Sequence, residues 1–101
     1  MKIIKQIVED MKEELDSAEH YAKKYAELKD SNRECAEKYQ KMAQDELRHV
    51  DMLYEMAVKE IKAEMAKGVV TPPAMQAVWD WEHEKMIEKT ARIKLLLNME
   101  R

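Results

Sequence analysis

The scarcity of helix-breaking residues is the feature that most constrains the fold of this 101-residue chain. Its only glycine is Gly68, and its only prolines follow closely at Pro72 and Pro73. The one other polar break is Asp30-Ser31-Asn32, whereas Ala, Glu, Lys, Met and Leu, all good helix formers, dominate the rest. We therefore predict one all-α domain over residues 1–101, with helices at about 3–29, 32–67 and 72–99.

The two breaks also carry signals for the helix ends. Ser31 with Glu34 has the spacing of a capping box that opens the second helix. Gly68 is typical of a residue that ends a helix. Thr71 with Pro72 indicates the N-cap and first turn of the third helix.

Composition and charge exclude several classes of protein. The net charge of −3 comes from interspersed charges of both signs, so we expect no nucleic-acid partner. No apolar run approaches the ~18–20 residues of a membrane span, and the first residues lack the pattern of a signal peptide. The single cysteine, Cys35, precludes an internal disulfide. These observations favour a cytoplasmic protein.

Each predicted helix carries an apolar stripe at spacings of three and four residues. In the first helix the stripe contains one charge, Glu14, among Ile4, Ile7, Met11, Ala18, Tyr21, Tyr25 and Leu28. In the second helix the stripe contains one carboxylate, Glu46, among Tyr39, Ala43, Val50, Leu53 and Ala57, with Met42 and His49 beside it. The third helix presents Met75, Trp79, Glu82, Met86, Ile93 and Leu97.

The short connection between the first two helices predicts that they pack antiparallel. Glu14 lies about sixteen residues before this connection and Glu46 about fifteen after it, so the two carboxylates should face each other at one height. Glu82 should lie roughly 18–20 Å from Glu46 if the third helix folds back along the second at 1.5 Å per residue.

Glu14, Glu46 and His49 therefore predict a metal site. An unpaired charge within an apolar stripe is costly unless it is compensated, and no Lys or Arg interrupts either stripe near this height. Carboxylates with one imidazole suit Fe, Mn or Zn. One chain supplies too few ligands for a dinuclear centre, whereas a two-fold axis beside the site doubles the set. The pattern thus predicts a site shared across a homodimer.

Glu14 followed by Tyr21, and then the Glu46-x-x-His49 motif, resembles the first helix pair of the ferritin-like superfamily, over about residues 4–66. The length and the single hairpin are most similar to the encapsulated ferritins. That resemblance implies a four-helix bundle rebuilt by dimerisation and a ferroxidase that oxidises Fe(II) to Fe(III) at a di-iron carboxylate centre, for iron storage or detoxification. It implies Glu14, Glu46 and His49 as iron ligands and catalytic residues, and Tyr21 as a hydrogen-bonding or redox partner beside them.

The same resemblance implies a homo-oligomer, either a dimer or a ring of dimers, and a compartment shell protein as a partner, which would place the protein inside a nanocompartment. The third helix is longer than this resemblance leads us to expect. Rubrerythrins carry a second Glu-x-x-His motif, and this chain carries one.

Two other functions fit the sequence. One is a di-iron peroxidase of rubrerythrin type, and the other is a metal-free structural helical assembly protein, in which water or cationic groups of a partner chain satisfy the two carboxylates. Weaker candidate sites are Asp80-x-x-His83 and a second cation site formed by Glu60 and Glu82. Of the two tryptophans, Trp79 and Trp81, we expect one in the core and the other at an interface.

Overall fold

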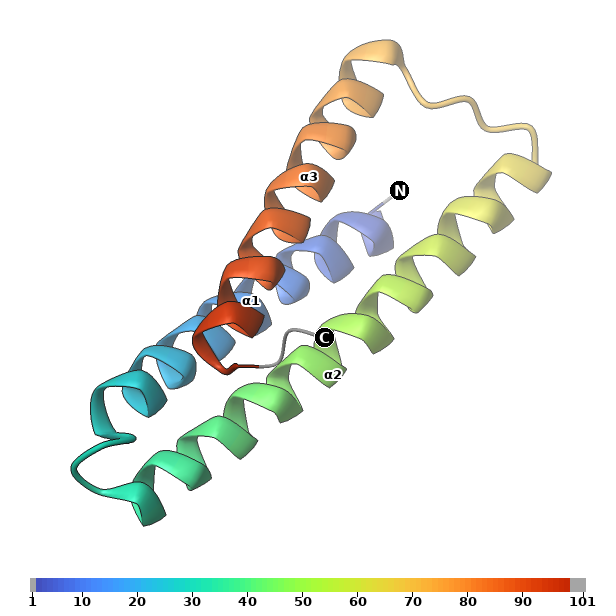
Figure 1. Cartoon of the computed structure of the whole chain (residues 1–101). Coiled ribbons are helices and arrows are strands. Elements are labelled where there is room, and N and C mark those ends of the chain that lie inside the picture. The colour runs from blue at the N-terminus through green and yellow to red at the C-terminus, as the bar shows by residue number, and fades with distance from the viewer. Residues whose placement is uncertain (1, 99–101) are drawn as a thin grey trace.

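The computed structural model describes residues 2–98, which form three α-helices and no strand: α1 (Lys2–Leu28), α2 (Arg33–Ala66) and α3 (Pro73–Leu96) (Figure 1). The all-α prediction is confirmed, and the helix bounds lie within three residues of those predicted from the sequence. The predicted end of the third helix, residue 99, lies outside the described residues. No helix in the described part of the chain is long and apolar enough to cross a membrane.

A tight turn joins α1 to α2, and backbone hydrogen bonds of ordinary length close it. The N–H groups of Lys29 and Asn32 donate to the carbonyls of Tyr25 and Leu28 at 2.9 and 2.8 Å. The predicted capping box is wrong by one residue, because the side chain of Asn32 is the N-cap and accepts from the Cys35 N–H at 3.2 Å. Asn caps a helix as well as Ser does, so either residue satisfies the free N–H groups of the first turn.

Gly68 ends α2 as predicted. It has φ +80°, the left-handed region that favours glycine, and its N–H donates to the carbonyl of Met65 at 3.0 Å. The predicted N-cap Thr71 is wrong, because Pro72 occupies that position and provides no side-chain cap. Pro72 stays extended, with φ −55° and ψ 142°, since the following Pro73 disfavours a helical conformation at the residue before it.

The buried face of α1 differs from the predicted stripe. Leu15 and Ala22 are fully buried, whereas Glu14 and Tyr21 are half-buried at the edge of the core. The reason is geometric: a seven-residue spacing drifts by about 20° per heptad around a straight helix. The series Ile7–Glu14–Tyr21 therefore leaves the core progressively. In α2 the same effect places Leu47 in the core beside Ala43 and Val50, and Glu46 at its edge.

α3 packs mainly on α1, although α2 precedes it in the chain. Ile93 and Leu97 are completely buried in this contact. Three ion pairs flank this contact, and the residue numbers of their members rise together along α1 and α3. Lys12 Nζ lies 2.7 Å from Glu82 Oε2, Asp16 pairs with Lys89, and Glu19 Oε2 lies 4.0 Å from Arg92 Nη2. α3 therefore runs parallel to α1 and antiparallel to α2 (Figure 1).

Two contacts connect α3 to α2. The ring of Tyr54 stacks on that of His83 with centroids 5.3 Å apart, and Gln40 Nε2 donates to the Leu97 carbonyl at 3.1 Å. The predicted separation of Glu82 from Glu46 assumed that the third helix folds back along the second, whereas α3 packs mainly on α1 and Glu82 pairs with Lys12, two residues from Glu14. The prediction that one tryptophan lies in the core is confirmed, because Trp79 packs against the core. Trp81 is 57% exposed.

The anchoring of α3 can be tested with Ile93→Ala. This side chain is completely buried between helices, so we expect the free energy of unfolding to fall by about 2–5 kcal/mol. Chemical denaturation monitored by circular dichroism measures the change. Met65→Ala serves as the control, because Met65 is 65% exposed and its truncation should change stability by less than about 0.5 kcal/mol. Equal losses in the two variants would contradict this packing.

Candidate metal centre

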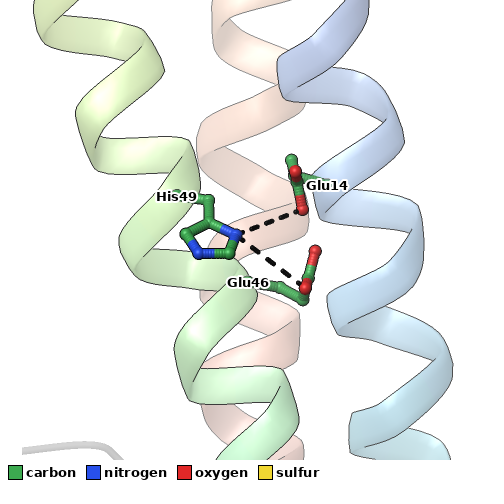
Figure 2. Close-up of side chains that lie close together, drawn as sticks. All are labelled: Glu14, Glu46 and His49. Atoms are coloured by element: carbon green, nitrogen blue, oxygen red, sulfur yellow. Dashed lines mark ion pairs between the residues drawn. The ribbon is translucent and has the colours of Figure 1, made fainter.

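Three potential metal ligands come together between α1 and α2. Glu14 projects from α1, and Glu46 and His49 project from α2 (Figure 2). His49 Nδ1 lies 3.6 Å from Glu14 Oε2 and 3.9 Å from Glu46 Oε1. One donor atom from each residue lies within 4.8 Å of the other two. Among residues 2–98, this is the one group of His, Cys, Asp and Glu side chains with such geometry.

The hairpin register brings these residues together. The turn holds the two helices antiparallel, and Glu14 and Glu46 are nearly equidistant from it along the chain. Glu46 and His49 are neighbours on the surface of α2 because residues three apart in a helix share a face. The predicted common height of the two carboxylates is therefore confirmed, and the imidazole lies beside both.

The site lies at the rim of the hairpin and remains open to solvent in the single chain. The side chains of Glu14, Glu46 and His49 are 31%, 21% and 50% exposed. The prediction placed both carboxylates within apolar stripes, and the helical drift described above moves them to the stripe edges. The single chain therefore removes only part of the water around the two carboxylates and the imidazole.

The open side of the site faces away from α3. Lys12 and Asp16, which pair with residues of α3, each lie two residues from Glu14, which is about 200° around the helix. Figure 2 shows α3 passing behind the hairpin, with the three side chains between α1 and α2. We call this side of the hairpin the open face.

The charges in the site are not balanced. Within residues 2–98, every ion pair formed by Glu14 or Glu46 is to His49, and neither carboxylate has a Lys or Arg partner. With a neutral imidazole the group carries two negative charges within a few ångströms. A bound cation compensates such a group directly.

The distances suit a first-row transition ion. Donor atoms about 2.0–2.2 Å from one ion lie roughly 3–4.2 Å from each other, and both His49–carboxylate distances fall in this range. The third pair of donor atoms, from Glu14 and Glu46, lies within 4.8 Å. Two carboxylates and one imidazole match Fe, Mn or Zn by ligand type. Three ligands leave other coordination positions free for water, substrate or a second set of protein ligands.

Tyr21 lies two helical turns from Glu14, near the α1–α2 turn. Its ring faces that of Tyr39, with centroids 6.1 Å apart, and lies edge-on to His20 at 5.6 Å. Tyr39 precedes Glu46 by the same seven residues that separate Glu14 from Tyr21. Since the hairpin register that brings Glu14 to Glu46 also brings Tyr21 to Tyr39, the sequence contained this pairing, although we did not predict it.

The weaker candidate sites are not assembled in the described residues. Asp80 accepts a hydrogen bond from Gln76 Nε2 at 3.0 Å, whereas His83 stacks on Tyr54. Glu82 pairs with Lys12, and no group of three or more potential metal ligands within residues 2–98 contains Glu60 or Glu82.

Apolar side chains border the candidate centre on the open face. Met42 lies one turn before Glu46 and is 41% exposed, and Met56, farther along α2, is 49% exposed. Tyr39 and Leu53 are half-buried on the same side of α2. The carboxylates thus lie within a surface that a second protein chain could cover.

Comparison with known proteins provides no independent guide to function. The chain matches no protein-family model, no curated protein and no solved structure. Its resemblance to ferritin-like proteins therefore depends on the few residues of the motif.

Binding of Co(II) tests the centre directly, because Co(II) accepts the same nitrogen and oxygen ligands as Fe(II) and is stable in air. We expect Co(II) at about one hundred times its Kd to raise the Tm by roughly 10 °C. Glu46→Gln should abolish this shift and the visible absorbance of bound Co(II). Glu55→Gln, an exposed carboxylate elsewhere on α2, should retain both. The same Co(II) response in all three proteins would contradict the assignment.

Proposed function

We propose that this protein is a ferroxidase that oxidises Fe(II) to Fe(III), for iron storage or detoxification, at a di-iron carboxylate centre shared by two copies of the chain. The observation that carries the proposal is the convergence of Glu14, Glu46 and His49 from two helices, with no Lys or Arg partner within the described residues. The choice of iron oxidation as the reaction depends on the ferritin-like order of these residues in the sequence.

The exposure of the ligands supports sharing between two chains. A carboxylate pair at the rim of a hairpin is half solvated, and a second copy on the open face would bury it and add two carboxylates and one imidazole. The doubled set, four Glu and two His, is the ligand complement of a di-iron carboxylate centre. The half-exposed Met42, one turn from Glu46, and Met56, farther along the same side of α2, provide apolar surface for such a contact.

The proposed chemistry requires binding and charge compensation from the protein. Each Fe(II) substrate ion supplies one electron to O2 or peroxide and becomes Fe(III). Glu14 and Glu46 stabilise the higher charge of Fe(III) more than that of Fe(II), because carboxylates are hard anionic ligands. His49 adds a neutral nitrogen ligand. Tyr21, two turns from Glu14 and paired with Tyr39, is proposed as the hydrogen-bonding or redox partner that the ferritin-like resemblance implies.

The reaction itself is tested by adding Fe(II) anaerobically and then admitting O2 or peroxide. We expect one iron bound per chain, or two per dimer, and rapid formation of Fe(III). Glu14→Ala, Glu46→Ala and His49→Ala should each lower the rate at least about 100-fold, while Glu55→Gln should keep the wild-type rate. A stable oligomer that binds no iron would instead support the structural assembly protein. Much faster oxidation by peroxide than by O2 would favour the peroxidase.

Sharing of the centre is tested by mixing chains. Wild-type protein is unfolded and refolded with an excess of Glu46→Ala chains, so that most wild-type chains acquire a variant partner. A shared centre then loses ligands, and the rate per wild-type chain should fall in proportion to the fraction of mixed dimers. Refolding with Glu55→Gln chains is the control and should leave the rate unchanged. A rate per wild-type chain that is independent of Glu46→Ala would show that one chain suffices.

A further inference from the structure

α3 exposes a second apolar surface on the side opposite its contact with α1. Met86, Ile93 and Leu97 are buried toward the hairpin, yet Val78, Trp81, Ile87 and Leu95 are 57–60% exposed on the outside. The small side chains of Ala77 and Ala91 are also exposed there. A helix that packed on α1 alone would present a polar outer face, so this pattern needs a different explanation.

The exposed positions follow the spacing of a coiled-coil seam. Alternating steps of four and three residues connect Ala77, Trp81, Glu84, Glu88, Ala91 and Leu95, and all six side chains are exposed. In heptad terms Trp81, Glu88 and Leu95 are at position a, and the other three are at position d. Val78 lies at position e and Ile87 at position g, which flank such a seam. We call these eight residues the α3 seam.

The sizes of the seam residues match those of a second copy in antiparallel orientation. In that orientation each a residue faces a d residue of the other chain. With the two-fold axis at the level of Met86, Trp81 faces Ala91 of the second copy and Leu95 faces its Ala77. Each large side chain thus meets a small one at both ends of the seam, which is how facing layers interdigitate. A parallel pair would place Trp81 against Trp81 and Ala91 against Ala91.

The flanking positions are also complementary in the antiparallel pair. Position g of one chain then lies near g of the other, so Ile87 meets Ile87 beside the axis and Asp80 meets Lys94 on both sides of it. Lys94 has no carboxylate partner within residues 2–98, and Asp80 has no cationic one. Charge and size therefore favour the same orientation.

We propose that the α3 seam binds a second copy of this chain in antiparallel orientation. This contact is separate from the one that would share the metal centre, because α3 lies on the other side of the hairpin from the open face (Figures 1 and 2). It requires no metal. At its centre Glu84 faces Glu88 of the other copy, and Lys85 lies next to both on the e side, with its Nζ 3.9 Å from the Trp81 ring centroid. The like charges weaken the middle of the seam, and the apolar ends hold it.

A cross-linking experiment on full-length, metal-free protein tests the proposal. In a Cys35→Ser background, Ile87→Cys places one thiol per chain beside the two-fold axis. A short bis-maleimide should join these thiols into a covalent dimer in most of the protein. The matched variant is Ala91→Cys, whose two thiols would lie about 15 Å apart along the axis at 1.5 Å per residue. It should give little cross-linked dimer.

The opposite pattern, with Ala91→Cys cross-linked and Ile87→Cys not, would indicate a parallel pair and overturn the proposal. Absence of cross-linking in both variants would overturn it as well. Repeating the experiment with Glu46→Ala separates this contact from the proposed function: the cross-link should persist when metal binding is lost. Circular dichroism of each cysteine variant establishes that the helices are intact.

Charge removal gives a second, independent test. Combined Glu84→Gln and Glu88→Gln substitution relieves the central repulsion and should strengthen association by roughly tenfold or more, measured as the dissociation midpoint in dilution experiments. Trp81→Ala should weaken it by a similar factor. Both substitutions alter exposed side chains and should leave the monomer fold unchanged. No change in the midpoint with either would overturn the proposal.

Discussion

The register of the α1–α2 hairpin is the constraint on which the rest of the structure depends. Only four residues, 29–32, separate the two helices, and the backbone hydrogen bonds of this turn leave little freedom to slide one helix along the other. The apolar packing of Leu15 and Ala18 against Ala43 and Leu47 then holds the register over several turns. Glu14 meets Glu46, and Tyr21 meets Tyr39, as a consequence of this one alignment. A shift by a single residue would separate both pairs.

Much of the fold and of the candidate site follows from the sequence, and the errors have a common physical origin. Gly68 and the Pro72-Pro73 pair mark the α2–α3 connection, and the positions of Glu14, Glu46 and His49 in the sequence predict that their side chains come together. Equal seven-residue spacing does not stay in the core, because a straight helix turns slightly less than two full turns in seven residues. Leu15 and Leu47 were missed for that reason. The sequence also does not predict which helix α3 packs against. Neither the α2–α3 connection nor the apolar stripe of α3 distinguishes packing on α1 from packing on α2.

The same helical drift that limited the prediction explains the position of the site. If Glu14 and Glu46 continued the core stripe, they would be enclosed by the chain itself, and desolvation of two carboxylates without a cationic partner would be costly. At the stripe edge both carboxylates keep contact with water, which lowers the cost of leaving them without a cationic partner in the single chain. Full burial of the three ligands therefore requires a second molecule on the open face. A half-buried carboxylate pair is accordingly better suited to a shared centre than a fully buried one.

α3 has a structural role on each of its sides. Its inner side, with Met86, Ile93 and Leu97, covers the core of the hairpin opposite the candidate metal centre, so that the centre stays uncovered. Its outer side carries the seam. If both proposed contacts form, on opposite sides of one chain, they would generate an assembly larger than a dimer, because each copy would then have two different neighbours. The rotation between the two axes decides whether such an assembly closes as a ring or extends as a filament. In such an assembly the crossing of α3 over α1 would set that rotation. The ion pairs of Lys12, Asp16 and Glu19 with α3 help to fix this crossing within one chain.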